Sequence, residues 1–212
     1  MHSYWSGADT KKNAENYFSD KYSKYSVAAT EYCQMTDDKN TGVYDLIAKE
    51  KNGTNGTSIK YGVAMANTIV DDLTIMNANE WDWWTACSYG TYTDGLIYLD
   101  EDNHENLDFS KRYYCLGNFS KFIKEGAVRV ACSSGVKNVR SVAFVNEDNT
   151  VVTVYVNNND KKAYTTIDCE GDYAVYTTDR DNDIAKTDFG KAKKVKVSLP
   201  ASSVVTVVYE AK

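Results

Sequence analysis

The chain has 212 residues, of which 42% are hydrophobic and 25% are charged, and its formal net charge is −6 at pH 7. This composition excludes a disordered chain, and the negative charge argues against nucleic acid or an anionic membrane surface as the main partner. No apolar run approaches the length of a membrane span, and no signal peptide follows Met1.

Strand-like and helix-like patterns alternate in the first half of the chain. Residues 27–32 and 80–84 predict short strands, and the Asn- and Gly-rich residues 51–57 predict a loop. A helix is predicted over residues 59–73, because apolar side chains recur at steps of three and four: Ile59, Val63, Ala66, Val70 and Leu73. With a further helix over residues 110–123, this order is typical of parallel βα units, as in a doubly wound sheet or a TIM barrel.

Residues 111–130, with the sequence KRYYCLGNFSKFIKEGAVRV, join that further helix to a strand-rich region. Ser110 can cap the helix, and Gly126 is predicted to end it. The predicted apolar stripe of the helix consists of Tyr113, Leu116, Phe119 and Ile123. Alternation with a period of two begins at Val128, so a strand is expected there.

The C-terminal third alternates cleanly between apolar and polar residues. For example, Val195 and Val197 share one face of a predicted strand, and Lys196 lies on the other. Strands are predicted over residues 128–132, 139–146, 150–157, 162–167, 173–178, 194–199 and 203–210. Strands of this length, separated by turns, are typical of an antiparallel β-sandwich.

Two segments in the first part of the chain carry candidate catalytic and binding residues. Glu31 stands at the carboxyl end of the strand in VAATEYC, residues 27–33, which is the end where barrel enzymes place their active sites. The alternative is a surface glutamate that begins a loop. His2 and Tyr4 belong to HSYW, for which the alternative is an aromatic segment without a chemical role.

A third segment, EWDWW at residues 80–84, is rich in tryptophan. Sugars present apolar C–H faces that stack on aromatic rings, so a tryptophan at a strand end suits a sugar subsite. The alternative for these tryptophans is core packing, which is favoured for Trp81 and Trp83. The following residues, 85–109, are expected to form a loop that could add further contacts from Tyr89, Tyr92 and Asp94.

The sequence predicts no metal site and no cofactor. Five cysteines lie at wide spacings without a CxxC pair, so they are predicted to be unpaired and mostly buried. DRDND at residues 179–183 begins like a calcium loop, but Ile184 and Gly190 stand where that loop requires glycine and glutamate, so a solvated turn is predicted. There is no phosphate-binding loop and no GxSxG motif.

In combination, HSYW, VAATEYC, EWDWW and residues 111–130 resemble family 30 glycoside hydrolases. The resemblance implies that residues 1–124 are the C-terminal part of a (β/α)8 TIM barrel, with strands resembling six to eight. Residues 125–212 would then be the family's antiparallel β-sandwich. It also implies roles for the candidate residues: Glu31 as the nucleophile, and His2, Tyr4 and Trp84 in substrate binding.

The same resemblance implies a retaining O-glycosyl hydrolase that acts outside the cell on a β-linked oligo- or polysaccharide of the β-1,6-galactan, xylan or glucan type. Such an enzyme needs a second carboxylate as general acid/base. The family carries it in an Asn-Glu-Pro-type motif on an earlier barrel strand, and this sequence has no such motif, its one proline being Pro200. The chain is therefore expected to be the C-terminal portion of the enzyme, with a missing N-terminal half as its partner and no useful hydrolysis alone.

A second hypothesis is a non-catalytic β-sandwich that binds carbohydrate or has a structural role, attached to a degenerate barrel remnant. Exposed aromatic side chains on one face of the sandwich would favour it. The candidates in the sequence are Tyr155, Tyr164, Tyr173 and Tyr176.

Overall fold

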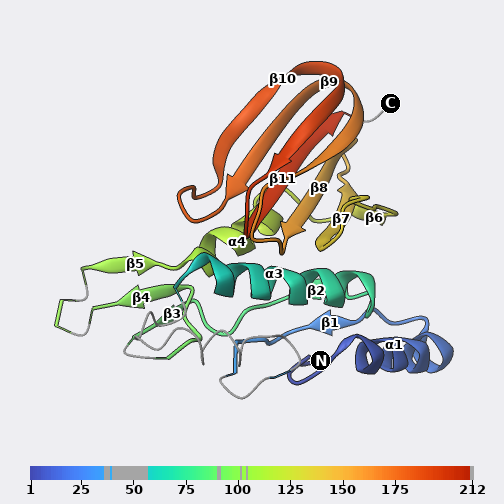
Figure 1. The fold of residues 1–212 in the computed structure, drawn as a ribbon. Coiled ribbons are helices and arrows are strands. Elements are labelled where there is room, and N and C mark those ends of the chain that lie inside the picture. Colours follow the sequence, from blue (N-terminus) through green and yellow to red (C-terminus); the bar gives the residue numbers. More distant parts are fainter. Residues whose placement is uncertain (36–38, 40–56, 90–91, 101, 104, 211–212) are drawn as a thin grey trace. The chain divides into compact units, whose positions relative to one another are not determined.

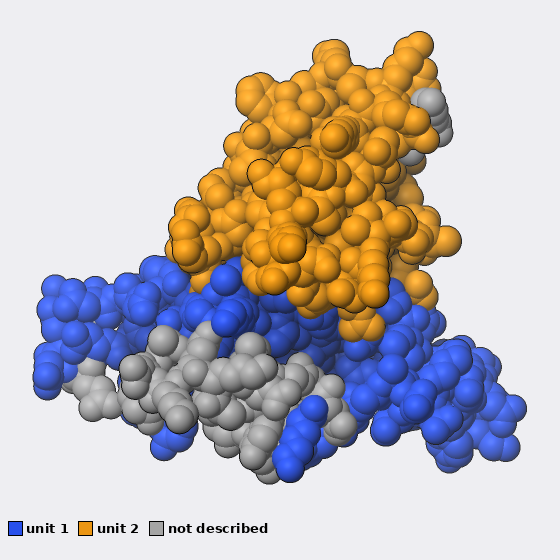
Figure 2. Space-filling model, viewed as in Figure 1, with its two compact units in different colours: residues 1–110 blue, residues 111–212 orange. Residues whose placement is uncertain are grey.

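The computed structural model describes residues 1–35, 39, 57–89, 92–100, 102–103 and 105–210, so nearly all of the loop predicted at 51–57 lies outside the described residues. The chain forms two compact units, Met1–Ser110 and Lys111–Lys212 (Figures 1 and 2). We call them the first and the second unit. The two units are separately compact and meet after residue 110. The domain boundary expected at residue 124 stays a prediction.

In the described part of the first unit, helices α1 and α3 accompany the short strands. Helix α3 (Ile59–Thr74) agrees with the predicted helix and is buried around most of its circumference. Helix α1 (Ala8–Tyr22) was not predicted. Its one buried residue is Lys11, so it lacks the apolar stripe by which a helix is recognised in a sequence.

Three segments of the first unit run parallel to one another. Strand β1 (Ala28–Ala29) pairs in parallel with β2 (Glu80–Trp81), and His2 forms a parallel bridge with Glu31 on the other side. Helix α1 connects the segment at 1–4 to β1, and α3 lies between β1 and β2 in the chain. The predicted parallel βα arrangement is therefore present (Figure 1).

The described residues between 85 and 109 include strands where a loop was predicted. They contain β3 (Cys87–Ser88), β4 (Ile97–Leu99) and β5 (Leu107–Phe109), which form a sheet in the order β3-β4-β5. Strands β3 and β4 are parallel, and β4 and β5 are antiparallel. Strands of two or three residues are too short to show a period in the sequence, which is why the pattern did not reveal them.

Helix α4 (Lys111–Ser120) opens the second unit, and its buried face differs from the predicted stripe. The buried residues are Arg112, Cys115, Asn118 and Phe119. Tyr113 is exposed, so the prediction was wrong for that residue, because the helix packs through polar groups as well as apolar ones. The helix also ends six residues before Gly126, which has a φ of 79° in the turn before the next strand.

The second unit contains a six-stranded antiparallel sheet in the order β10-β9-β11-β8-β7-β6. Its strands are β6 (Val128–Val130), β7 (Val139–Val145), β8 (Thr150–Asn157), β9 (Ala163–Thr178), β10 (Ala185–Leu199) and β11 (Ser203–Glu210). The strands predicted at 162–167 and 173–178 are one continuous strand, β9. Strand β10 begins nine residues before the predicted start at 194, because its first half is largely exposed and lacks alternation.

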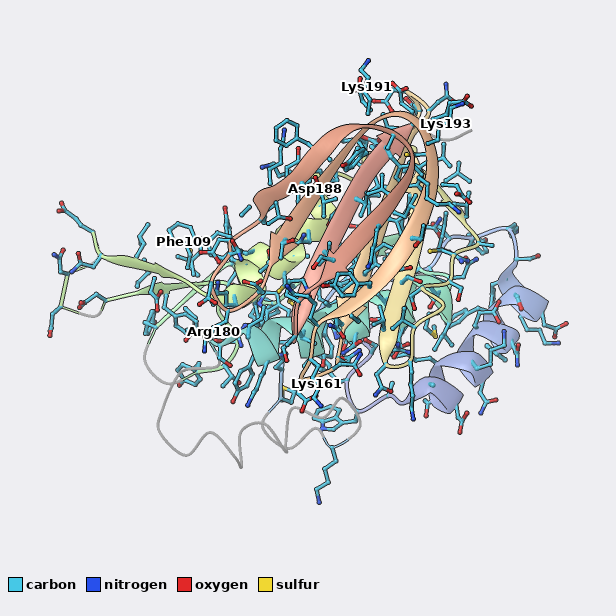
Figure 3. All side chains as sticks on the ribbon, turned by 45° about the horizontal axis from the view of Figure 1, so that its top comes forward. Phe109, Lys161, Arg180, Asp188, Lys191 and Lys193 are labelled. Carbon is cyan, nitrogen blue, oxygen red and sulfur yellow. The ribbon has the colours of Figure 1, made fainter. Side chains whose placement is uncertain are left out.

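The sheet bends so that it covers its own apolar face. The bend lies where Gly171 has a φ of 122° and where the β9–β10 register shifts between Ala192 and Lys194. One core cluster results: Val139, Tyr155, Ile167, Cys169, Val175, Val195, Val197, Leu199, Val205 and Val207. In Figure 3, Lys191 and Lys193 mark the bent end of this hairpin, and Arg180 marks the turn at its other end. The predicted sandwich is formed in this way.

Candidate active site

Glu31 lies two residues beyond β1, at the carboxyl end of the parallel segments. Its partner in the parallel bridge is His2, so the two side chains leave neighbouring segments at the same level. The Glu31 side chain is 32% exposed, which leaves it accessible from solvent. This position matches the end of a parallel barrel where active sites form.

Two side chains converge on one oxygen of the Glu31 carboxylate. The Tyr4 hydroxyl donates a hydrogen bond of 3.0 Å to Oε1, and Nδ1 of His2 lies 3.6 Å from the same oxygen. Among the described residues, Oε2 of Glu31 forms no hydrogen bond and no ion pair. These polar contacts therefore hold the carboxylate through one oxygen.

Tyr4 is fixed by its neighbours as well as by Glu31. Its ring stacks on that of Tyr32, with centroids 5.5 Å apart, and its hydroxyl lies 3.7 Å from the sulfur of Cys33. Burial raises the pKa of Tyr4 well above its usual range, and the neighbouring Cys33 and Glu31 raise it further. Tyr4 consequently remains a neutral hydrogen-bond donor to the carboxylate across the physiological pH range.

Trp81 in β2 and the following Trp83 and Trp84 have different surroundings. The ring nitrogen of Trp81 donates to Asp72 at 2.9 Å, and that of Trp83 donates to the carbonyl of Asp94 at 2.5 Å. Trp84 is 55% exposed, and its backbone N–H donates to the Tyr32 carbonyl at 2.9 Å. Trp84 thus stands beside the Glu31 segment with an open ring face, whereas Trp81 and Trp83 are tied inside the unit.

The further candidates in residues 85–109 separate into two groups. Asp94 accepts the hydroxyl of Ser88 at 2.7 Å through its carboxylate, and its carbonyl accepts the N–H of Thr85 at 2.9 Å. Asp94 therefore holds this segment together. Tyr89 and Tyr92 are exposed, so their rings are open to solvent.

Sequence reasoning missed a buried polar cluster beneath this region. Asp72 of α3 is fully buried and lies 2.8 Å from Nζ of Lys11, which is only 2% exposed. The other carboxylate oxygen of Asp72 accepts hydrogen bonds from Ser3 at 2.8 Å and from Trp81 at 2.9 Å. The available signal was the pair of aspartates Asp71 and Asp72 between Val70 and Leu73 of the amphipathic helix.

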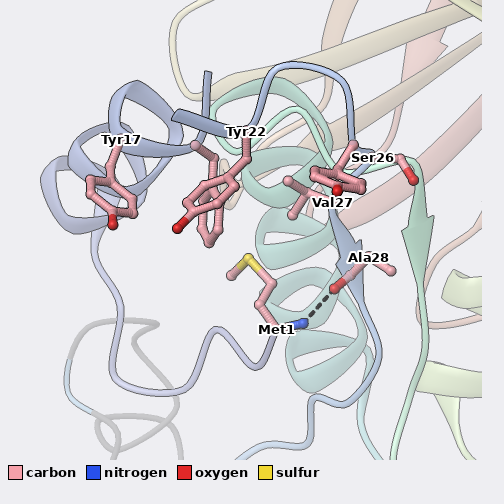
Figure 4. A pocket seen from close by; sticks show the side chains of 8 residues that line it. Met1, Tyr17, Tyr22, Ser26, Val27 and Ala28 are labelled. Carbon is pink, nitrogen blue, oxygen red and sulfur yellow. Dashed lines mark hydrogen bonds between the residues drawn. The ribbon is translucent and has the colours of Figure 1, made fainter. Parts of the chain in front are cut away.

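One hollow in the first unit is not lined by the candidate site residues. It has a volume of about 500 Å³ and lies between α1 and the start of β1 (Figure 4). Its lining consists of Met1, Tyr17, Phe18, Tyr22, Tyr25, Ser26, Val27 and Ala28. This hollow therefore adjoins the amino end of β1, and Glu31 lies beyond the opposite end.

The tyrosines considered for carbohydrate binding on the sandwich differ in exposure. Tyr155 is buried in the core of the second unit, and Tyr173 and Tyr176 are half-buried. Tyr164 is exposed, with the Lys196 ammonium 4.4 Å from its ring centroid. Of these four residues, Tyr164 alone presents an open ring.

Cysteines and acidic residues add no metal centre to the described part of the chain. All five cysteines are free, as predicted, but Cys87 and Cys132 are exposed. Residues 179–183 form the turn between β9 and β10, in which Asp179 Oδ1 accepts the N–H groups of Asp181 and Asn182. Within the described residues, no three His, Cys, Asp or Glu side chains gather as metal ligands, and no helix is long and apolar enough to cross a membrane.

Comparison with protein families matches the chain twice to one family. Residues 1–98 match the description "O-Glycosyl hydrolase family 30", and residues 126–207 match "Glycosyl hydrolase family 30 beta sandwich domain". The parallel βα segments followed by a β-sandwich correspond to part of a (β/α)8 barrel and the sandwich domain that follows it. The chain belongs to glycoside hydrolase family 30, which confirms both the predicted family and the predicted fold class.

Solved structures have the same fold. A GH30 endoxylanase from Clostridium papyrosolvens C71 gives a TM-score of 0.74 at 22% identity, covering 99% of this chain and 48% of that one. A conserved exported protein from Bacteroides fragilis gives 0.80 at 25% identity, covering 98% and 45%. An endo-beta1,6-glucanase gives 0.59 at 17% identity, covering 97% and 39%. The chain therefore spans less than half the length of these proteins.

Proposed function

We propose that the chain is the C-terminal portion of a retaining β-glycan hydrolase in which Glu31 is the nucleophile. The observation that carries the proposal is the arrangement around Glu31, where Tyr4 and His2 meet Oε1 at 3.0 and 3.6 Å at the carboxyl end of parallel strands. Membership of family 30 supports a glycosidic bond as the substrate.

In this mechanism Oε2 of Glu31 attacks the anomeric carbon and forms a covalent glycosyl-enzyme, while the bond to the leaving oxygen breaks. Tyr4 and His2 hold Oε1, so the carboxylate keeps one orientation during the attack. The open ring of Trp84 stacks on the apolar face of the sugar. Water then releases the sugar with retained configuration.

The leaving oxygen must be protonated by a second carboxylate, and we assign that group to a part of the barrel outside these 212 residues. The sequence contains no Asn-Glu-Pro motif, which supports this assignment. General acid–base help contributes roughly 10²–10⁴-fold. We accordingly expect no useful hydrolysis from this chain alone, and a separate N-terminal half is the partner that would complete the site.

For the whole enzyme we propose a β-linked polysaccharide of the xylan, β-1,6-glucan or β-1,6-galactan type, hydrolysed outside the cell. Similar folds include a protein described as an endoxylanase, one described as an endo-beta1,6-glucanase and one described as exported. These names support the class of substrate and the location, and glycan assays would separate the three linkages.

A chimaera tests the role of Glu31, joining this chain to the N-terminal barrel half of the Clostridium papyrosolvens endoxylanase. The substrate is an aryl β-xylobioside with a dinitrophenolate leaving group, which departs without a general acid. We expect Glu31→Ala to abolish turnover and added azide to restore it, because azide takes the place of the missing nucleophile and gives an α-glycosyl azide.

Glu80→Ala is the matched control, since Glu80 is an exposed carboxylate on the neighbouring strand β2. It should leave turnover within about twofold of the parent chimaera, as exposed substitutions usually do. Full activity of Glu31→Ala without azide would refute the nucleophile assignment.

The non-catalytic alternative remains for the second unit, and the exposed ring of Tyr164 is the observation that favours it. It predicts that residues 111–212 alone bind insoluble β-glycan and that Tyr164→Ala releases them. Binding that needs the first unit, or that survives this substitution, would argue against it.

A further inference from the structure

One buried carboxylate contacts three parts of the first unit. Asp72 on α3 is fully buried; its Oδ1 faces the Lys11 ammonium of α1 at 2.8 Å, a contact between charges. Its Oδ2 accepts the Ser3 hydroxyl at 2.8 Å and the ring N–H of Trp81 at 2.9 Å. Buried charges are costly unless they are paired, so each of these contacts is strongly favoured.

The two groups bound by Oδ2 belong to the segments on either side of Glu31. Ser3 lies between His2 and Tyr4 in the chain, and successive side chains of an extended segment point in opposite directions. The Ser3 hydroxyl therefore reaches back to Asp72, whereas Tyr4 reaches Oε1 of Glu31. On the other side, Trp81 belongs to β2, which leads to Trp84.

We propose that Asp72 is a positioning residue that sets the placement of Tyr4 and His2 on Glu31 by tying Ser3 to α3 and β2. The role of Asp72 in catalysis rests on the proposed function, whereas its hydrogen bond with Ser3 is a property of the fold. Lys11 balances the charge of the Asp72 carboxylate. The hydrogen bond from Ser3 requires an acceptor oxygen at this position.

The described backbone pairing of this segment lies at its start, before Tyr4, and the Tyr4 ring and hydroxyl are held by Tyr32, Cys33 and Glu31. The bridge between His2 and Glu31 is isolated, and the hydrogen bonds Met1 to Ala28 and Thr30 to Met1 lie at the start of the segment. Beyond His2 the chain turns away at Trp5, which has a φ of 53°. The Ser3–Asp72 hydrogen bond anchors the residue next to Tyr4 to helix α3.

The experiment compares two double variants of the 212-residue chain, because removing one charge of a buried pair can prevent folding. Lys11→Met with Asp72→Leu removes both charges and the acceptor oxygen. Lys11→Met with Asp72→Asn removes both charges and retains an acceptor oxygen for Ser3 and Trp81. Ser3→Ala breaks only the link to the Tyr4 segment.

The readout is the NMR signal of the ¹³Cζ-labelled Tyr4 phenol at neutral pH, assigned by its loss in Tyr4→Phe. Glu31→Gln supplies the reference for a Tyr4 hydroxyl that has lost its charge-assisted hydrogen bond. We expect the Leu double variant and Ser3→Ala to move the signal to this reference position, and the Asn double variant to leave it unmoved. The exposed pair Lys12–Glu15, replaced by Met and Leu, is the control and should leave the signal unmoved.

An unmoved signal in Ser3→Ala, or in a folded Leu double variant, would overturn the proposal, as would equal movement in the Leu and Asn double variants. If the Leu double variant fails to fold, Ser3→Ala decides alone. If the NMR result is as expected but azide fails to rescue Glu31→Ala, the positioning of Tyr4 through Asp72 stands and the proposed function is refuted.

Discussion

The two units stabilise their sheets in different ways. In the second unit, seven of the eight residues of β8 are buried, and the bent sheet covers its own apolar face. In the first unit, β1 and β2 have two residues each, and the buried Asp72 carboxylate links β2 and Ser3 to the helices. The second unit thus supplies partners for its own surfaces, whereas the first depends on a few specific contacts.

This difference leads us to expect that the first unit opens more readily. Local opening free energies follow buried apolar contacts and protected backbone hydrogen bonds, and the second unit has the larger described sheet, with six strands. In amide exchange on the intact chain, residues 139–210 should be protected longer than residues 60–84. Strong protection of 60–84 with none in 139–210 would reverse the comparison.

The largest expected effect is that of Lys11→Met, which leaves the buried Asp72 carboxylate without its counter-charge. Breaking a buried ion pair in this way costs about 3–5 kcal/mol, so the first unit should lose amide protection while the second keeps it. Lys12→Met is the control, since Lys12 is exposed and should change little. Loss of protection in both units together would mean that they unfold as one.

The next effect is expected in the second unit, at Asn118 of α4. This fully buried side chain donates to the Thr206 hydroxyl at 2.9 Å and accepts from the Thr178 hydroxyl at 2.5 Å. Asn118→Ala leaves these groups unpaired and should lower the free energy of unfolding by roughly 2–3 kcal/mol. Chemical denaturation measures it, with exposed Asn158→Ala as the control; equal midpoints for the two would contradict the importance of this contact.

A smaller effect is expected at the bend of β9. Gly171 has a φ of 122°, and an added Cβ would meet the flexible carboxylate end of Glu210, which can move. The cost of Gly171→Ala therefore lies mainly in the backbone and should be roughly 1–2 kcal/mol. A thermal midpoint equal to that of the parent chain would show that the bend does not require glycine.

The smallest effect is expected for Lys194→Ala on the outer face of the sandwich. Its ammonium lies 3.4 Å from Asp168, but both side chains are more than 60% exposed. Surface pairs of this kind contribute about 0.5 kcal/mol or less after solvent screening. A loss as large as that of Asn118→Ala would show that surface charge, and not the core, stabilises the second unit.

The sequence predicted the parts of the fold that follow a regular apolar period. Helix α3 and strand β8 were placed within one residue, because their buried positions are apolar and evenly spaced. Helix α1 was missed because its buried residue is Lys11, and the face of α4 was misplaced because Asn118 packs by hydrogen bonding. Polar burial carries no periodic signal.

The candidate site shows the same limit. The sequence singled out Glu31, Tyr4 and His2 by resemblance, and the structure brings them to one oxygen atom. Nothing in the sequence indicated that Ser3 and Trp81 bind the same carboxylate, that of Asp72. Ser3 and Asp72 are 69 positions apart in the chain. Only the fold brings such residues together.

The position of β11 has a consequence for the synthesis of the protein. It is the last strand of its sheet in the chain, yet it lies between β8 and β9 and forms backbone ladders with both. While the ribosome makes the chain from its N-terminal end, the β7–β8 and β9–β10 hairpins emerge first, each with one edge unfilled. The sheet can be completed only after β11 has left the exit tunnel. Until then, the edges of β8 and β9 that pair with β11 should stay unpaired in the nascent chain, and we expect chaperones to protect them.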